Sequence, residues 1–158
     1  MITDKFSHWV TWNKRKELTG LNYPGVYAIA HSNINIAGKK FSWKKEICYF
    51  GMSNSTKGLK GRISQFDSTI RDKVKGRHGG AERFNYKYKD YDKLVKRLYV
   101  SVRVFECDVT SNSPDDLNKM GDVAKLEYAC LAHYVDKCGR LPEFNDKQKS
   151  PKKDKKSR

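Results

Sequence analysis

The sequence predicts one α/β domain, because short apolar runs typical of strands alternate with longer segments of helical periodicity. Strand-like runs occupy residues 26–30, 46–52 and 98–107, and the helical pattern covers residues 59–74 and 114–138. The 158 residues are enough for one domain with a core of its own, which we assign to residues 1–146.

The N-terminal residues 1–22 predict a short helix packed on the body of the domain. Phe6, Trp9 and Val10 follow one another at the i, i+3, i+4 spacing of a helix face. Pro24 and Gly25 then end this segment, and the first strand follows directly. Residues 33–45, with four lysines, form a long connection to the second strand.

The central part of the chain predicts a helix and a third strand. Apolar residues recur every three or four positions over residues 59–74, which indicates a helix with one apolar stripe. Glycines at 76, 79 and 80 end that helix in a loop, and the basic, tyrosine-rich residues 81–97 have no clear assignment. Residues 98–107 alternate between apolar and polar side chains, as in a half-buried strand.

The last predicted helix has signals at both ends. Ser113 is an N-cap followed by Pro114 in the first turn and Asp116 at the third helical position, and Gly139 is a C-cap after Cys138. Residues 147–158 have seven basic side chains and one acidic one, so we expect a disordered basic tail.

The composition points to nucleic acid as the partner. The net charge is +15, from 33 Lys and Arg against 18 Asp and Glu, and a polyanion would relieve that repulsion. No apolar run is long enough to span a membrane, so no membrane contact is expected. Four cysteines without a Cys-x-x-Cys pair are expected to be free thiols, and with no signal peptide this favours the cytoplasm.

Glu127 is the carboxylate that most suggests chemistry. At helical spacing it lies on the same face as Val123, Cys130 and Tyr134. A carboxylate among apolar side chains is costly unless it is paired or binds a metal. It could form a buried ion pair with Arg62 or Arg103, or hold Mg²⁺, which needs only one or two protein ligands.

Two tyrosines and an arginine accompany that carboxylate. Tyr27 and Tyr49 are predicted on adjacent strands, near enough to meet across the sheet, although each alone would be read as a core aromatic. Arg62 lies at the edge of the apolar stripe of its helix, from which a guanidinium can reach a phosphate. On a helix this basic, a solvated surface arginine is the alternative.

These residues together resemble the GIY-YIG nuclease family. The motifs occur in order along most of the chain: Gly25-Val26-Tyr27, Tyr49-Phe50-Gly51, Gly58-Leu59-Lys60-Gly61-Arg62, Leu126-Glu127-Tyr128 and Pro142-Glu143-Phe144-Asn145. The resemblance implies a small, mainly antiparallel sheet of about three strands flanked by helices. It also implies Mg²⁺-dependent hydrolysis of DNA to 5′-phosphate and 3′-hydroxyl ends, with Mn²⁺ as a substitute metal.

The resemblance also implies residue roles. Tyr27 and Tyr49 would act on the attacking water, Arg62 on the phosphoryl oxygens, and Glu127 as the metal ligand, while Asn145 would tether the C-terminal segment near the site. One helical turn after the arginine, Phe66 stands where the family often has His or Tyr. His78 is our candidate to replace that proton carrier, although a loop histidine is more often exposed and idle.

Double-stranded DNA is the expected substrate, with a homodimer or a protein partner as a source of site specificity. The backbone contacts are assigned to basic residues of the first long helix and the following loop, namely Lys57, Lys60, Arg71, Lys73, Lys75 and Arg77; residues 33–45 could also touch DNA. Two alternatives are a catalytically inactive protein of the same fold, which binds DNA or serves as an inhibitor or assembly subunit, and a basic RNA-binding protein that stacks bases on its tyrosines.

Overall fold

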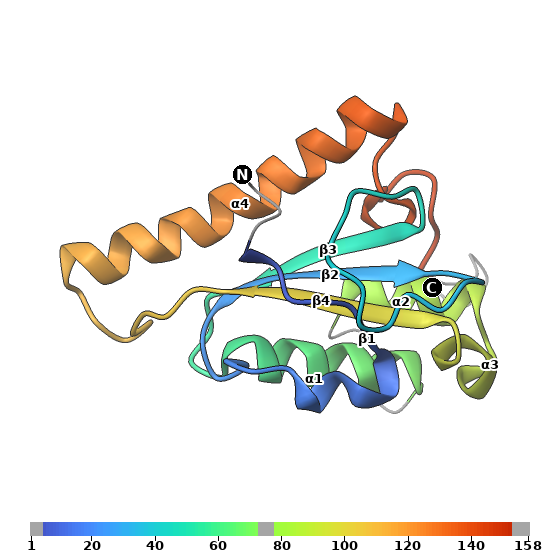
Figure 1. The fold of residues 1–158 in the computed structure, drawn as a ribbon, viewed down its shortest axis with the longest axis horizontal. Helices are drawn as coiled ribbons and strands as arrows, with labels where there is room; N and C mark the ends of the chain where they lie inside the picture. Colours follow the sequence, from blue (N-terminus) through green and yellow to red (C-terminus); the bar gives the residue numbers. More distant parts are fainter. Residues whose placement is uncertain (1–4, 73–77, 153–158) are drawn as a thin grey trace.

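A four-stranded antiparallel sheet forms the centre of the protein (Figure 1). The computed structural model describes residues 5–72 and 78–152. The strands β1 (Val10–Thr11), β2 (Gly25–His31), β3 (Ile47–Ser53) and β4 (Leu98–Val104) follow the order β1-β4-β2-β3 across the sheet. The predicted class of a small antiparallel sheet flanked by helices is therefore confirmed. The predicted count of three strands is wrong, because the two-residue strand β1 pairs with β4.

The N-terminal segment is not the predicted helix. Its residues form β1 and then the 3₁₀ helix η2 (Trp12–Glu17). Phe6 and Trp9, whose spacing suggested a helix face, instead stack on Phe41 at ring-centroid distances of 4.2 and 5.3 Å. Phe41 belongs to the long connection between β2 and β3, so contacts distant in sequence decide the conformation here.

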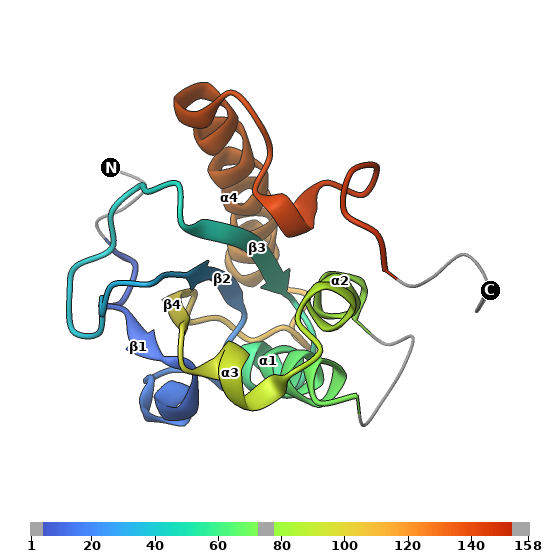
Figure 2. The same cartoon turned by 90° about the vertical axis from the view of Figure 1, so that its right-hand side faces the viewer.

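The helices cover the two faces of the sheet (Figures 1 and 2). On one face lie α1 (Gly58–Ile70), α2 (Gly79–Lys87) and α3 (Tyr91–Val95), and on the other lies α4 (Pro114–Cys138). The helix α1 ends four residues before the prediction of 74, and Asp72 beyond it has a positive φ of 64°. The segment 81–97, which the pattern left unassigned, contains most of α2 and all of α3.

Both predicted caps of α4 are confirmed. The Ser113 hydroxyl accepts a hydrogen bond from the Asp116 backbone N–H at 3.2 Å, and Gly139 adopts the left-handed conformation with φ 73°. Val123, Cys130 and Tyr134 of α4 are buried against the sheet, as the helical spacing predicts. This face of α4 also carries Glu127 toward the edge strand β3.

The C-terminal segment closes the free edge of β3. The 3₁₀ helix η3 (Glu143–Asn145) places the Asn145 amide beside Phe50, where it accepts from the backbone N–H and donates to the backbone carbonyl, each at 2.9 Å. Beyond it, the tail expected to be disordered packs on α2 as far as residue 152, since Ser150 is buried and its carbonyl accepts from Arg83 Nε at 3.1 Å. Residues 153–158 lie outside the described part of the chain.

Two further expectations concern the cysteines and the membrane. All four cysteines are free, and Cys48 and Cys130 are buried. Among residues 5–72 and 78–152, no helix combines the length and the apolar character that crossing a bilayer requires.

Candidate functional site

Five of the six predicted catalytic residues line one cleft of about 410 Å³. Its wall is formed by β2, β3, α1, α4 and the C-terminal segment, which contribute Tyr27, Tyr49, Arg62, Glu127 and Asn145 respectively. The five residues span 119 positions of sequence but meet at the outer edge of β3. The sixth residue, His78, lies behind the cleft against Tyr27.

The register between β2 and β3 sets the position of the tyrosines. Tyr27 lies opposite Gly51 and Tyr49 lies opposite Ile29, so both side chains point to the same face, with ring centroids 6.0 Å apart. A Cβ atom on Gly51 would overlap the Tyr27 ring and hydroxyl, and one on Gly80 would overlap the Tyr49 ring. The Tyr27 ring therefore requires the glycine at position 51 of β3, and the Tyr49 ring requires the glycine at position 80 of α2.

His78 is completely buried and touches Tyr27. Its Nε2 atom lies 2.7 Å from the Tyr27 hydroxyl oxygen, and its Nδ1 caps α2 by accepting a hydrogen bond from the Ala81 backbone N–H at 3.3 Å. The cap requires the lone pair on Nδ1, so the neutral ring carries its proton on Nε2 and donates it to Tyr27. Burial, with the nearby charge of Arg62, lowers the pKa of His78 to about 3, so the ring is neutral at neutral pH.

Phe66 of α1 packs its ring edge-on against His78 at a centroid distance of 5.0 Å. His78, for which an exposed and idle loop position was the alternative to a catalytic role, is therefore part of the aromatic cluster around Tyr27.

Both cleft tyrosines are neutral hydroxyls in the free protein. Burial raises the pKa of Tyr27 well above its usual value, and the nearby Tyr49 and Glu127 add to this while Arg62 opposes it. Burial also raises the pKa of Tyr49, against the charge of Arg62. A hydrogen bond between the two hydroxyls raises the pKa of Tyr27 and lowers that of Tyr49.

Arg62 and Glu127 face the cleft from opposite helices, and both are half-buried. Burial raises the pKa of Glu127, and the charge of Arg62 partly offsets that rise. Arg62 also donates from Nη1 to Gln65 Oε1 at 3.0 Å, which steadies its side chain on α1. The other proposed partner of Glu127, Arg103, lies over the Phe105 ring at 4.8 Å.

The cleft offers a single carboxylate for a metal ion. Within the described ranges 5–72 and 78–152, no cluster of three or more His, Cys, Asp or Glu side chains could hold a metal. Glu127, half-buried at an open cleft with its pKa raised by burial, still fits Mg²⁺, because this ion takes one or two protein carboxylates and completes its shell with water and substrate phosphate.

The structure describes three of the six residues predicted to contact the DNA backbone, namely Lys57, Lys60 and Arg71, and their surroundings differ. Arg71 forms an ion pair with Asp67 at 2.7 Å and stacks over Tyr91 at 4.0 Å, so its guanidinium is already bound within the protein. Lys60 lines a separate hollow of about 300 Å³ beside Arg15 and Lys16, while Lys57 is exposed just before α1. Lys73, Lys75 and Arg77 lie outside the described residues.

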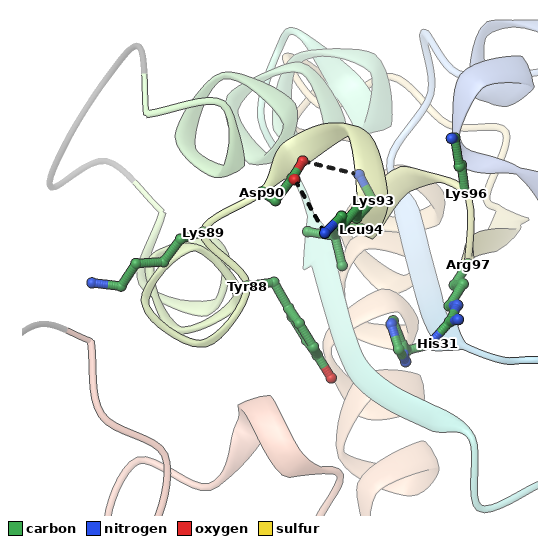
Figure 3. Close-up of a pocket in the computed structure, with 8 residues that line it drawn as sticks. All are labelled: His31, Tyr88, Lys89, Asp90, Lys93, Leu94, Lys96 and Arg97. Carbon is green, nitrogen blue, oxygen red and sulfur yellow. Dashed lines mark hydrogen bonds and ion pairs between the residues drawn. The ribbon is translucent and has the colours of Figure 1, made fainter.

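Another hollow, of about 470 Å³, lies where α2, α3 and the end of β2 meet (Figure 3). His31 and Tyr88 stack there at 4.8 Å, but Lys93 pairs with Asp90 at 4.0 Å, and the side chains of Lys89 and Lys96 point away from it. It contains none of the predicted catalytic residues.

The cleft also has lining residues that the sequence reasoning missed. Tyr128, 73% exposed, and Lys147 are the two with polar groups. Each lies within two positions of a predicted site residue, Glu127 or Asn145, and that adjacency is the signal that could have identified them.

Comparisons with family models, curated proteins and solved structures found no match to this chain.

Proposed function

We propose that this protein is a Mg²⁺-dependent DNA endonuclease that works as the GIY-YIG family does. The observation that carries the proposal is the meeting of two tyrosines, an arginine and one carboxylate, from four separate elements, in one cleft. A purely structural role would not require a desolvated carboxylate and an arginine to face an open cleft.

The reaction is hydrolysis of a phosphodiester. A water oxygen forms a bond to phosphorus, the bond from phosphorus to the 3′ oxygen breaks, and the 3′ oxygen gains a proton from solvent. The products are a 5′-phosphate and a 3′-hydroxyl. Arg62 stabilises the negative charge that develops on the phosphoryl oxygens, since its guanidinium offers two N–H donors to one phosphate.

Tyr27 takes the proton from the attacking water. Because its hydroxyl is neutral, it accepts that proton only as its own proton moves on through Tyr49 to the cleft solvent. His78 donates its Nε2–H to the Tyr27 oxygen and thereby stabilises the negative charge that grows there. In this arrangement His78 is a hydrogen-bond donor, and the role of proton carrier, for which His78 was the candidate from the sequence, belongs to Tyr49.

Glu127 would hold the metal ion. When bound, Mg²⁺ supplies a Lewis acid for the leaving 3′ oxygen, and Mn²⁺ is expected to substitute. Asn145 fixes the C-terminal wall of the cleft through its two bonds to Phe50.

The net charge of +15 supports binding to double-stranded DNA, with a second copy or a protein partner as a source of site specificity. We place this activity in the cytoplasm, where all four thiols would stay reduced.

Incubation of supercoiled plasmid with the protein tests the function. We expect nicked or linear product with Mg²⁺ or Mn²⁺ and none with EDTA, and a Tyr27→Phe variant should lose most of the activity. Absence of cleavage by pure, folded protein that still binds the plasmid would point to an inactive binding protein of the same fold. Cleavage or binding of an RNA in preference to DNA of the same sequence would favour the RNA-binding alternative.

A further inference from the structure

The segment after η3 is held on both sides of Lys147. On one side, Asn145 is bonded twice to Phe50 of β3. On the other, the buried Ser150 is bonded to Arg83 of α2. Between them, the Asp146 carboxylate accepts hydrogen bonds from the backbone N–H groups of Gln148 and Lys149, at 3.1 Å each, and closes a turn.

Lys147 is the one residue of this turn that lines the cleft. Its side chain is exposed, and within residues 5–72 and 78–152 no carboxylate lies within 4.0 Å of its ammonium group. Lys147 thus brings an exposed ammonium group to the lining of a cleft to which the buried Tyr27 also contributes. The cleft then has two cations, Arg62 and Lys147, against the single carboxylate of Glu127.

We propose that Lys147 binds a phosphate of the nucleic-acid strand next to the scissile phosphate, and so positions the strand in the cleft. This inference rests on the proposed function for the identity of the strand. Arg62 and Glu127 are half-buried and line the cleft with the buried Tyr27, against which the scissile group lies in the proposed reaction. Lys147 lines the same cleft with an exposed side chain, so we assign it to a flanking phosphate. The lysine acts as a point charge there, which suits a flanking phosphate that needs no fixed geometry.

The same turn supplies a matched control. Lys149 is also an exposed lysine, two residues further on, but it does not line the cleft. Lys147→Ala and Lys149→Ala therefore remove the same charge from the same turn, and only the first removes it from the cleft. Neither substitution touches the Asp146 or Asn145 side chains that hold the segment.

The first experiment measures binding without cleavage. Salt titrations of binding to a short duplex in EDTA compare the wild type with the two variants. The slope of log K against log[salt] should become shallower by about 0.9 for Lys147→Ala, the value for one phosphate contact, and stay unchanged for Lys149→Ala. Equal slopes for all three proteins, or equal losses in both variants, would overturn the proposal.

The second experiment uses steady-state cleavage with Mg²⁺. For Lys147→Ala we expect KM to rise several-fold with little change in kcat, because the contact positions the strand and does not act on the reacting atoms. Lys147→Arg should restore KM, since it restores the charge. A fall in kcat at constant KM would overturn the positioning role. If the wild type does not cleave, the proposed function fails while the binding titrations still decide the role of Lys147.

Discussion

Two carboxylates on opposite faces of the sheet, the buried Asp67 and the half-buried Glu127, have opposite environments. Asp67 on α1 is only 8% exposed and has four partners: Trp12 Nε1 at 2.8 Å, the Tyr91 hydroxyl at 2.7 Å, and the guanidinium groups of Arg71 at 2.7 Å and Arg15 at 3.1 Å. Burial raises the pKa of Asp67, but these hydrogen bonds and charges outweigh it and lower the pKa below the usual value.

Glu127 on α4 is also desolvated, yet its pKa is raised, because only the charge of Arg62 opposes the burial. The protein thus satisfies the Asp67 carboxylate with its own donors, whereas Glu127 lines an open cleft with only the charge of Arg62 set against its burial. The difference separates a carboxylate that joins η2, α1 and α3 from the one that we propose as the metal ligand.

The largest expected effect on stability is that of Asp67→Asn. The amide keeps the shape but removes the charge, so Arg15 and Arg71 lose their ion-pair partner beside the core. We expect the free energy of unfolding to fall by about 3 kcal/mol, the lower end for a broken buried pair. Urea denaturation measures it, with Glu127→Gln as the matched acid-to-amide control that should be as stable as the wild type or slightly more stable.

A smaller effect is expected from pH, which should change the difference in free energy of unfolding between the wild type and each of these two variants. The folded pKa of Asp67 is lowered, so its contribution to stability is present above the unfolded pKa of about 3.9 and is lost as pH falls through the folded pKa. The folded pKa of Glu127 is raised, so its contribution is present below the unfolded pKa of about 4.3 and is lost as pH rises through the folded pKa.

Denaturation curves from acidic to neutral pH should therefore show opposite trends. The deficit of Asp67→Asn relative to the wild type should shrink as the solution is made acidic. The advantage of Glu127→Gln should grow as the pH rises toward neutrality. As pH rises, the free energy of unfolding relative to the wild type should therefore fall for Asp67→Asn and rise for Glu127→Gln. If it changed in the same direction for both variants, the two carboxylates would not have the opposite environments described above.

Part of the fold could be predicted because its signals are local. The strands β2, β3 and β4 are apolar runs bounded by glycine, proline or polar residues, and α4 has a cap at each end. The strand β1 could not be predicted this way, because its two residues are defined by pairing with β4, which lies about 90 positions later in the sequence. The polar, tyrosine-rich α2 and α3 depend on Phe84 and Leu94, which are buried in the same core cluster.

The candidate site likewise has residues that could be predicted from the sequence and contacts that could not. Tyr27, Tyr49, Arg62 and Glu127 carry recognisable motifs, so their approach to one another could be anticipated from residue types and order. The contact between His78 and Tyr27 depends on the start of α2, which follows residues with no clear periodicity. Asp67 went unnoticed because its four partners come from η2, α3 and its own helix, and their meeting is a result of tertiary packing.

The most direct measurement compares plasmid cleavage by the wild type, Glu127→Gln and Asp67→Asn, with Mg²⁺ and at a temperature where all three proteins are folded. We predict that Glu127→Gln loses at least about 100-fold in rate, because losing the metal ligand removes several kcal/mol of transition-state stabilisation. Asp67→Asn should cleave at nearly the wild-type rate despite its lower stability. Cleavage by Glu127→Gln at the wild-type rate, or an equal loss in both variants, would contradict the assignment of Glu127 to catalysis and of Asp67 to stability.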